Sequence, residues 1–294
     1  MTTRAGHGLA LATLGAIAFS GKAIIVKLAY RHGVDAVTLI MLRMLFALPM
    51  FAALAWWAGR GRPALTRRDW GSIALLGFCG YYLASFLEFA GLQYVSASLE
   101  RLMLYLNPTL VMLIGVVWLK RRPSARQLAA LGVSYLGVLL VFGQELQVAG
   151  EHVALGAALV FASALSYAVY LVAGGEVVKR IGSLRLTGLA TTVACVLCIV
   201  QFLVLRPLDA ATGVAPAVVW LSVVNAIACT FAPIVMMMMA VERIGAPLAA
   251  QVGMVGPLST IAMSVLFLGE PFTRWVAAGT ALVLAGVWLL ARAR

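Results

Sequence analysis

Ionisable side chains lie inside segments that are otherwise apolar, and they are the first candidates for chemistry in this chain. Lys22, Arg43 and Glu88 each stand within a long apolar run, and Glu100 and Arg101 stand near the start of another. A charge inside a bilayer is costly, so such residues usually face a cavity or a partner. We expect Lys22, Arg43 and Glu88 to contact charged groups of a small molecule. The alternative is a structural Arg43–Glu88 ion pair, with Lys22 extending towards the membrane interface.

Tyrosines and one asparagine near predicted kinks form a second set of candidates. Tyrosine combines a broad apolar face with a polar tip, which suits a pocket that accepts varied side chains. Packing between helices is the alternative role for each of them. The candidates in this set are Tyr82, Tyr105, Asn107, Tyr167 and Tyr170.

The sequence shows no pattern typical of an enzyme active site, a metal site or a cofactor site, and we expect none of them. His7, His32 and His152 show no ligand spacing, and neither a zinc-protease motif nor a glycine-rich phosphate loop occurs. Cys195 and Cys198 have a spacing found in redox and metal sites. They lie within an apolar run without a nearby lysine or histidine, so we interpret them as buried, inert thiols.

The composition identifies the environment in which these residues act. Of 294 residues, 63% are hydrophobic and 11% are charged, and the mean hydropathy is +1.02. These values depart far from those of soluble domains and predict an integral membrane protein with the lipid bilayer as its partner. The net charge of +12 does not indicate nucleic-acid binding, because the basic residues punctuate apolar segments instead of forming one patch.

The apolar runs separate into about ten segments of membrane-spanning length, which needs about 20 residues. The sequence therefore predicts an all-α integral membrane fold. The predicted spans are residues 8–29, 35–58, 70–91, 96–119, 126–143, 153–173, 184–205, 217–240, 245–268 and 272–291.

The distribution of lysine and arginine predicts the orientation, because cytoplasmic loops retain these residues. The N-terminus, alternate loops and C-terminus carry most of them, whereas the opposite side holds Arg31, Arg206 and Arg274, with Lys27 at its edge. We expect a multi-pass protein of the inner membrane with both termini in the cytoplasm. Residues 143–152 are then the outer connection between the two halves of the chain.

The chain contains one pattern twice. Asn107-Pro108 lies near the middle of one predicted span, and Gly256-Pro257 lies in the corresponding span of the second half. Proline removes a backbone donor, so Pro108, Gly256 and Pro257 are expected to kink these helices and to act in gating. We predict two five-helix repeats, 1–145 and 146–294. Because five is odd, the second repeat is inverted, an arrangement found in transporters with a central cavity at the repeat interface.

Several motifs together resemble the two EamA repeats of the drug/metabolite transporter superfamily. They are Gly91-Leu-Gln-Tyr-Val-Ser-Ala-Ser98, Asn107-Pro108, Ala240-x-x-Arg243-x-Gly245-Ala246, Gly256-Pro257 and Leu268-Gly269-Glu270-Pro271. The resemblance implies ten helices, with helices 1–4 and 6–9 around a central cavity and with helices 5 and 10 packed together. Small residues at Ala277, Ala281 and Ala285, and at Ala129 with Gly137 or Ala130 with Ser134, are the expected packing faces.

Within the superfamily the chain is most similar to the YddG-type exporters, which release amino acids and other small metabolites. The resemblance implies a secondary transporter that exports amino acids, including aromatic ones, by alternating access and that functions as a monomer. We hypothesise that Lys22 or Arg43 meets the substrate carboxylate and that Glu88 or carbonyls at the kinks meet the ammonium group. The substrate side chain would contact Tyr82, Tyr105 and Tyr167. A proton-coupled exporter of drugs or organic cations is the alternative, with Glu88 as its membrane-buried carboxylate.

Overall fold

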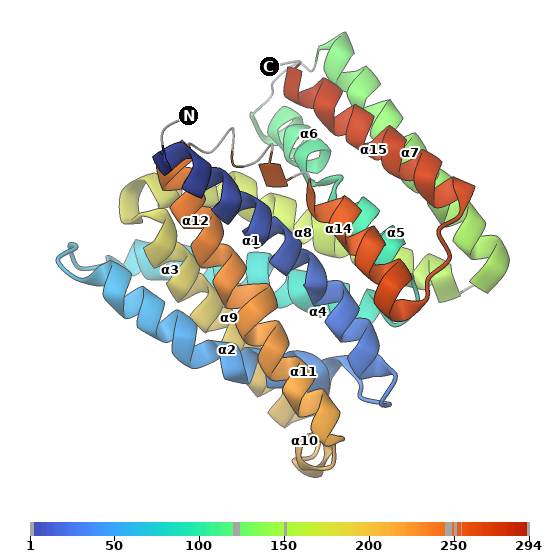
Figure 1. Cartoon of the computed structure of the whole chain (residues 1–294). Coiled ribbons are helices and arrows are strands. Elements are labelled where there is room, and N and C mark those ends of the chain that lie inside the picture. The colour runs from blue at the N-terminus through green and yellow to red at the C-terminus, as the bar shows by residue number, and fades with distance from the viewer. Residues whose placement is uncertain are drawn as a thin grey trace. The chain divides into compact units, whose positions relative to one another are not determined.

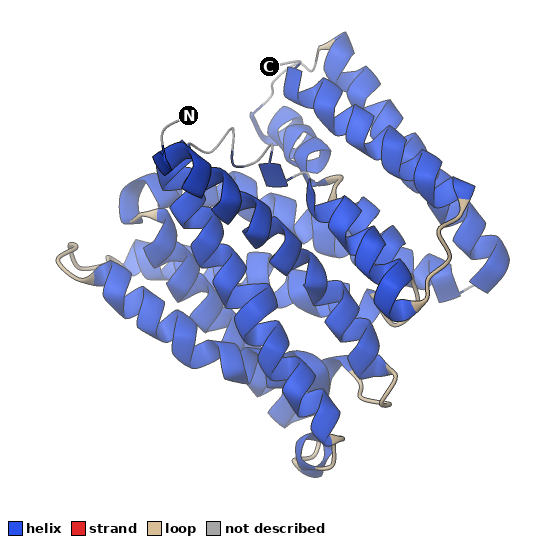
Figure 2. Cartoon of the chain, in the orientation of Figure 1, coloured by secondary structure: helices blue, strands red, loops and turns tan. Residues whose placement is uncertain are grey.

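The computed structural model describes residues 3–119, 124–149, 152–244, 249, 252–253 and 255–292, which form helices and no strand (Figure 2). Within this part of the chain, eight helical segments are long and apolar enough to cross a bilayer. Shorter apolar helices cover Val255–Leu268 and Arg274–Leu290. These segments match the ten predicted spans, although the start of the predicted span 245–268 lies outside the described residues. The prediction of an all-α membrane fold is confirmed.

The described helices form two compact units, and each unit draws on both halves of the sequence. Unit 1 comprises residues 1–63 and 184–269, and unit 2 comprises residues 64–183 and 270–294. The predicted repeats 1–145 and 146–294 divide the chain differently, and they stay a prediction.

Unit 1 is organised around α1, which packs against α11, α12 and α14; α1 and α12 run side by side in Figure 1. Its helices follow the apolar runs of the sequence, with short turns between them. Their bounds are α1 (Thr3–Tyr30), α2 (Ala36–Gly59), α9 (Ser183–Leu205), α10 (Asp209–Thr212), α11 (Pro216–Ala226), η2 (Ile227–Phe231), α12 (Ala232–Ile244), α14 (Val255–Met263) and η3 (Ser264–Leu268).

Unit 2 is organised around α8, which packs against α4, α5, α6 and η1. The segments labelled η in both units are π-helices, in which the backbone hydrogen bonds span five residues instead of four. The bounds in unit 2 are α3 (Arg67–Gly77), η1 (Phe78–Leu83), α4 (Ala84–Gly91), α5 (Ala97–Leu104), α6 (Asn107–Leu119), α7 (Ala125–Ala149), α8 (His152–Ile181) and α15 (Arg274–Arg292).

The central helices of the two units occupy equivalent places in the sequence repeat. Their first residues, Thr3 and His152, are 149 positions apart, as are Pro108 and Pro257. Both helices end close to a glycine with positive φ, Gly33 at 77° and Gly182 at 87°. Glycine adopts this left-handed conformation without a steric penalty, so it ends a helix and turns the chain.

The two helices α7 and α15 lie side by side in unit 2 (Figure 1), as the resemblance implies. Their backbones approach closely where Gly137 faces Gly279: a Cβ atom on Gly137 would lie 2.6 Å from the Gly279 carbonyl oxygen. On α15 the predicted packing face is wrong, because Ala281 and Ala285 are exposed. The close contacts fall on Gly279 and Gly286 instead, since a hydrogen side chain permits a closer approach than the methyl group of alanine.

Candidate functional site

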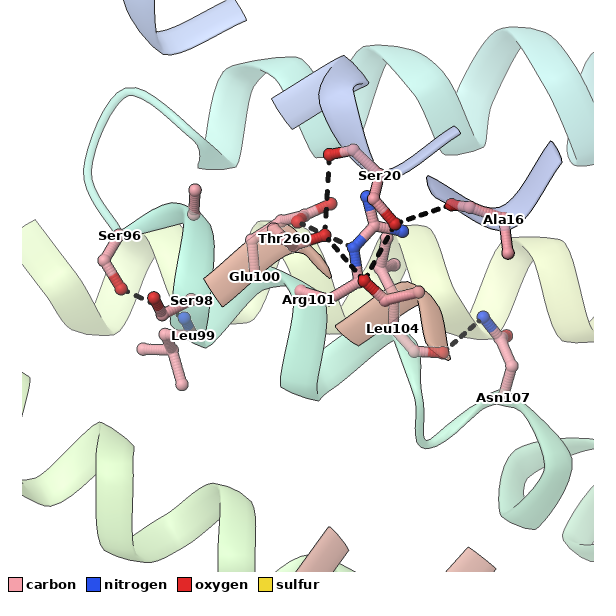
Figure 3. Close-up of polar contacts among 12 residues, drawn as sticks. Ala16, Ser20, Ser96, Ser98, Leu99, Glu100, Arg101, Leu104, Asn107 and Thr260 are labelled. Atoms are coloured by element: carbon pink, nitrogen blue, oxygen red, sulfur yellow. Dashed lines mark hydrogen bonds and ion pairs between the residues drawn. The ribbon is translucent and has the colours of Figure 1, made fainter. Parts of the chain in front are cut away.

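The predicted span that contains Pro108 is interrupted in the structure. Helix α5 ends at Leu104, Tyr105 and Leu106 form a turn, and α6 begins at Asn107. The Asn107 side-chain amide donates to the Leu104 carbonyl at 2.8 Å (Figure 3), and the Thr109 hydroxyl donates to the Leu106 carbonyl at 2.7 Å. The Asn107 amide satisfies the Leu104 carbonyl, whose partner one turn later would be Pro108, a residue without an amide hydrogen. The Leu106 carbonyl also accepts from the Thr109 and Leu110 backbone amides, so α6 forms regular helical bonds directly after the break.

The second proline lies in a different setting. Gly256 and Pro257 are buried in the first turn of α14, whereas Pro108 is exposed. The Gly256 carbonyl accepts hydrogen bonds from Ser20 of α1 at 2.8 Å and from Thr260 at 3.3 Å (Figure 3). The predicted motif Ala246-Pro247-Leu248 lies outside the described residues. The roles of Pro108, Gly256 and Pro257 in gating stay predictions.

Unit 2 contains a backbone irregularity that the sequence analysis missed. The π-helix η1 interrupts the span Arg67–Gly91 near its middle. From the neighbouring α8, Ser166 donates to the Cys79 carbonyl at 2.8 Å, and Ser163 donates to the Ala84 carbonyl at 2.7 Å. A π-helix disturbs the regular ladder of backbone hydrogen bonds and is frequent at functional sites. Hydroxyl groups from α8 thus stabilise carbonyls at both ends of η1.

Three tyrosines meet where η1 packs against α8, and we call Tyr81, Tyr167 and Tyr170 the tyrosine cluster. The rings of Tyr167 and Tyr170 stack at a centroid distance of 5.5 Å, and Tyr81 contacts Tyr170 edge-on at 5.2 Å. The hydroxyl groups of Tyr81 and Tyr170 are 3.2 Å apart and share a hydrogen bond. Gly80 makes room for this packing, since its Cβ would lie 2.5 Å from Cδ2 of Tyr170.

The tyrosine cluster contains two of the five predicted side chains, and Tyr105 and Asn107 lie elsewhere, at the break after α5. Tyr167 and Tyr170 were predicted, but the third member is Tyr81 and not Tyr82, whose ring lies 5.4 Å from that of Phe78. Consecutive residues of a helix point in directions about 100° apart, and a π-turn changes which of them faces a neighbour. The hydropathy pattern carries no signal for that change, so it could not have distinguished Tyr81 from Tyr82.

The predicted cations both lie buried in unit 1. Lys22 in α1 is 5% exposed, and its Nζ atom lies 4.8 Å from the ring centroid of Phe19, a cation–π contact. Arg43 in α2 is 4% exposed. Its guanidinium lies close enough to the Cys195 and Cys198 thiols of α9 to interact with them electrostatically. Protein atoms therefore enclose Lys22, and both its substrate contact and its extension towards the membrane interface stay predictions.

Unit 2 holds the buried carboxylates. Glu88 in α4 is 4% exposed, and its pairing with Arg43 stays a prediction. Glu100 in α5 is fully buried beside Arg101, with 4.0 Å between the Glu100 Oε2 and Arg101 Nε atoms (Figure 3). Arg101 also acts electrostatically on Tyr105 at the break after α5. Two consecutive charges in an apolar run were visible in the sequence, but their position near a predicted helix start concealed their burial.

Contacts between loops agree with the predicted sidedness within each unit. Each such contact joins two segments that the topology predicts on one side of the membrane. On the predicted outer side these are Asp35–Arg206 and Arg31–Leu268 in unit 1, and Ser96–Glu145 and Gln144–Thr273 in unit 2; on the inner side they are Pro63–Arg185 in unit 1 and Asp69–Arg180 in unit 2.

The outer loop of unit 1 contains a defined carboxylate. Asp35 caps α2, accepting from the Val37 amide at 3.0 Å and the Thr38 hydroxyl at 2.5 Å, and Arg206 donates to it at 3.2 Å. Burial alone would raise the pKa of Asp35, but the hydrogen bonds from Thr38 and the Arg206 charge hold this pKa below its usual range. Asp35 therefore links the start of α2 to the end of α9.

Within the described ranges, no three histidine, cysteine, aspartate or glutamate side chains gather in a way that could hold a metal ion. The polar groups of the spans are instead hydroxyls, one asparagine and a few buried charges. Buried charges and interrupted spans in a polytopic helical fold define a membrane transporter, since such features are costly unless they serve a path or a partner.

The family comparison agrees with this class. The model of the EamA-like transporter family matches residues 6–143 and again residues 154–292. The chain belongs to the EamA-like transporter family.

Two relatives are named as transporters, and neither name states a substrate. An uncharacterized transporter, YcbK of Bacillus subtilis (strain 168), is 29% identical over 275 residues, which cover 90% of this chain and 86% of that one. An uncharacterized transporter of Archaeoglobus fulgidus is 24% identical over 284 residues, 95% of each chain. A crystal structure with a TM-score of 0.65 covers 97% of both chains at 18% identity, a likeness that shows the fold alone.

Proposed function

We propose that this transporter exports amino acids, including aromatic ones, and similar small metabolites across the inner membrane by alternating access. The tyrosine cluster beside η1 supports this proposal most strongly. It places aromatic faces and a hydroxyl pair midway along the span Arg67–Gly91. Aromatic rings bind other rings in edge-on or offset geometry, and their hydroxyls orient polar groups.

A zwitterion needs a cation for its carboxylate and an anion or carbonyl for its ammonium group. Lys22 and Arg43 are the proposed carboxylate contacts, because both are buried cations in spans. Glu88 is the proposed ammonium contact for the same reason. A charge pair formed with the substrate at such a buried position contributes to binding, because charge pairs are stronger away from water.

Transport by purified protein in liposomes tests the proposal. Vesicles loaded with single radiolabelled amino acids would be assayed for efflux and counterflow, with and without a proton gradient. We expect phenylalanine or tyrosine among the transported species. Tyr167→Ala, in the tyrosine cluster, and Lys22→Ala should slow transport about tenfold or more, the factor that corresponds to about 1.4 kcal/mol of lost binding.

Two exposed residues provide matched controls. Tyr94→Ala changes a tyrosine in the loop after α4, and Lys179→Ala changes a lysine in the last turn of α8, both exposed. Neither should alter transport. Unchanged efflux in both Tyr167→Ala and Lys22→Ala, or no transport of any amino acid by the wild type, would contradict the proposal.

Export of organic cations coupled to protons is a second candidate. The buried carboxylates Glu88 and Glu100 favour it, since such groups relay protons in other transporters. This function predicts that a lipophilic organic cation leaves loaded vesicles only when a proton gradient is present. It also predicts that Glu88→Gln or Glu100→Gln abolishes that dependence. Cation efflux that is insensitive to the gradient and to both substitutions would exclude it.

A further inference from the structure

The helix α5 is held at its first turn by two carboxylates that are distant in sequence. Glu270 accepts from the Ala97 amide at 2.8 Å and from the Ser98 amide and hydroxyl at 3.3 and 2.8 Å. Glu145, near the end of α7, accepts from the Ser96 amide at 3.1 Å and from the Ser96 hydroxyl. All of these residues belong to unit 2.

These contacts satisfy every amide at the start of α5. The amides of Ser96, Ala97 and Ser98 bond to the two carboxylates, and the Leu99 amide bonds to the Ser96 hydroxyl at 3.0 Å (Figure 3). The first amides of a helix have no partner within it, and the positive end of its dipole favours anions. Carboxylate acceptors make stronger hydrogen bonds than neutral ones. The first turn of α5 is therefore fixed to α7 and to the segment that precedes α15.

A third contact ties these two supporting segments to each other. The Thr273 hydroxyl donates to the Gln144 side-chain carbonyl at 2.9 Å, and Thr273 also accepts from the Val276 amide at the start of α15. The residues adjacent to Glu145 and Glu270 are thus connected independently of α5. The two carboxylates are presented by a joined frame and not by separate loops.

Helix α5 is the first part of the interrupted span, and it contains two of the buried charged residues of unit 2. Glu100 ends the first turn of α5 and Arg101 follows it, and the helix stops at Leu104, directly before the break at Tyr105 and Leu106. With only eight residues, α5 has little stability of its own, because short helices depend on tertiary contacts. Its position therefore depends on the contacts at its first turn.

We propose that Glu145 and Glu270 are positioning residues for transport, which hold α5 so that Glu100, Arg101 and Tyr105 keep the arrangement that binds substrate. This inference rests on the proposed transport function. It also gives the Leu268-Gly269-Glu270-Pro271 motif a role: Gly269, at a φ of 72°, turns the chain after η3, and Glu270 follows the turn directly.

The repeat makes this anchor specific to one side of the protein. The residues 149 positions from Glu270 and Glu145 are Arg121 and Arg294. Both lie outside the described residues, but an arginine side chain has no acceptor for backbone amides. The two positions equivalent to Glu145 and Glu270 therefore carry no carboxylate, and the anchor occurs once in the repeat, at the predicted outer end of unit 2.

Counterflow kinetics of the full-length protein in liposomes test the inference, with radiolabelled phenylalanine as the probe. We expect Glu270→Gln and Glu145→Gln each to raise KM about tenfold while Vmax stays within about twofold, because fewer molecules hold α5 in the binding arrangement. Asp209→Asn, which removes an exposed outer-side carboxylate in α10 of unit 1, should leave KM unchanged. Glu270→Asp should restore part of the wild-type KM.

The rise in melting temperature on addition of substrate shows whether Glu145 and Glu270 position α5 for binding or only stabilise the fold. Substrate raises the melting temperature of a protein that binds it, and this rise should shrink in Glu270→Gln and in Ser98→Ala. Glu270→Gln and Ser98→Ala both affect the contact between the Ser98 hydroxyl and Glu270. A protein that carries both substitutions should therefore have a KM no higher than that of the stronger single variant. If Glu270→Gln fails to insert, Glu145→Gln and Ser98→Ala test the same anchor.

The outcomes distinguish the two levels of the proposal. A wild type that does not transport phenylalanine or any other amino acid overturns the proposed function. A wild type that transports, together with anchor variants of unchanged KM and an unchanged substrate-induced rise in melting temperature, overturns the role of Glu145 and Glu270. An equal increase of KM in Asp209→Asn would also overturn it.

Discussion

Each unit contains a π-helix at the same place in the repeat, and the two differ in what packs against them. In unit 2, η1 starts at Phe78 and packs against α8; in unit 1, η2 starts at Ile227, 149 residues later, and packs against α1. Two π-helices at equivalent positions indicate that the irregular backbone is a shared feature of both repeats. The side chains at each contact have diverged.

Where each π-helix comes closest to the central helix of its unit, a glycine faces a larger residue, but the glycine lies on the π-helix in unit 2 and on the central helix in unit 1. In unit 2, Gly80 of η1 faces Tyr170 of α8; in unit 1 the equivalent positions hold Cys229 in η2 and Gly21 in α1. A Cβ on Gly21 would lie 3.1 Å from the Cys229 sulfur. Both arrangements fill the space, but an aromatic ring with a hydroxyl group results only in unit 2.

The polar groups at the two π-helices are also satisfied differently. Ser163 and Ser166 reach η1 from another helix, whereas the Thr230 hydroxyl of η2 donates to the Asn225 carbonyl of its own span at 2.8 Å. The side chain of Phe231 packs edge-on against Phe51. Unit 1 thus has packed apolar groups at this position, whereas unit 2 has tyrosine rings and hydroxyl groups. The comparison teaches that the two repeats share a backbone irregularity and differ in the side chains that surround it, and the proposed recognition of substrate depends on those of unit 2.

The largest effect should come from filling the contact in unit 2. Gly80→Ala places a methyl group against Tyr170, whose ring is held by Tyr167 and Tyr81. Overpacking of this kind costs about 1–3 kcal/mol, so we expect efflux to fall about tenfold. Gly174→Ala in α8 is the control. The nearest atom to the added carbon would lie at 3.9 Å, an ordinary van der Waals distance, so this substitution overpacks nothing.

The matching change in unit 1 should be tolerated. In Gly21→Ala the neighbour is the end of the Cys229 side chain, which a movement of a few tenths of an ångström relieves. We expect transport within about twofold of wild type, since less than about 0.5 kcal/mol is involved. A loss as large as that of Gly80→Ala would remove the functional distinction between the two units.

A smaller effect is expected from the hydroxyl groups that stabilise η1. Ser166→Ala leaves the Cys79 carbonyl without its donor from α8, a cost of about 1–2 kcal/mol. KM should rise several-fold, and Ser166→Thr, which keeps a hydroxyl, should restore part of it. For Thr230→Val in unit 1 we expect a lower melting temperature with KM unchanged. A KM change in Thr230→Val of the same size would argue against the comparison.

Tyr81→Phe should have a modest effect. It removes the hydrogen bond between the Tyr81 and Tyr170 hydroxyls and leaves the ring contacts in place. A neutral hydrogen bond contributes about 1 kcal/mol, so transport should fall by about threefold to fivefold. Counterflow of tyrosine and phenylalanine, measured in parallel, shows whether the hydroxyl pair also contributes to selectivity. Identical kinetics in the variant and the wild type would show that the pair has no role in transport.

The smallest effect is expected from a substitution remote from η1 and η2, which shows how large a change unrelated to the comparison can be. Asp35→Asn keeps a side-chain acceptor at the start of α2 but weakens the link to Arg206, which should lower stability by about 1 kcal/mol or less. Because the folded-state pKa of Asp35 is depressed, its contribution is present above the unfolded pKa of about 3.9 and is lost as pH falls below it. The difference in melting temperature should therefore be constant from about pH 7 to 5 and shrink below about pH 4.

The sequence predicted the spans and the interruption at Asn107-Pro108 because both have strong local signals, whereas a kink at Pro257 stays a prediction. Apolar runs of membrane-spanning length are unambiguous, and Asn107-Pro108 marks a point where a helix loses a donor. The π-helices have no such signal, since an added residue in a helical turn leaves hydropathy unchanged. The packing face of α15 was assigned to Ala281 and Ala285 because four-residue spacing of small residues suggested it, and only tertiary contact shows that Gly279 and Gly286 are used.

The candidate site was predicted in part for a related reason. Lys22, Arg43 and Glu88 are buried as expected of charges that cannot reach water. The roles of Glu145 and Glu270 could not be predicted, because they depend on contacts over 49 and 173 residues of sequence. Tertiary contacts of that separation leave no trace in a local pattern.

One comparison of two variants tests most directly whether recognition of the substrate's aromatic side chain is concentrated in unit 2. Tyr170→Leu removes an aromatic ring beside η1, and Phe231→Leu removes one within η2. Counterflow of radiolabelled phenylalanine would be measured for both in liposomes, normalised to the amount of inserted protein. We predict that KM rises about tenfold in Tyr170→Leu, as expected for a lost aromatic contact of about 1.4 kcal/mol, and stays within about twofold of wild type in Phe231→Leu. Equal increases, or a larger increase in Phe231→Leu, would contradict the account.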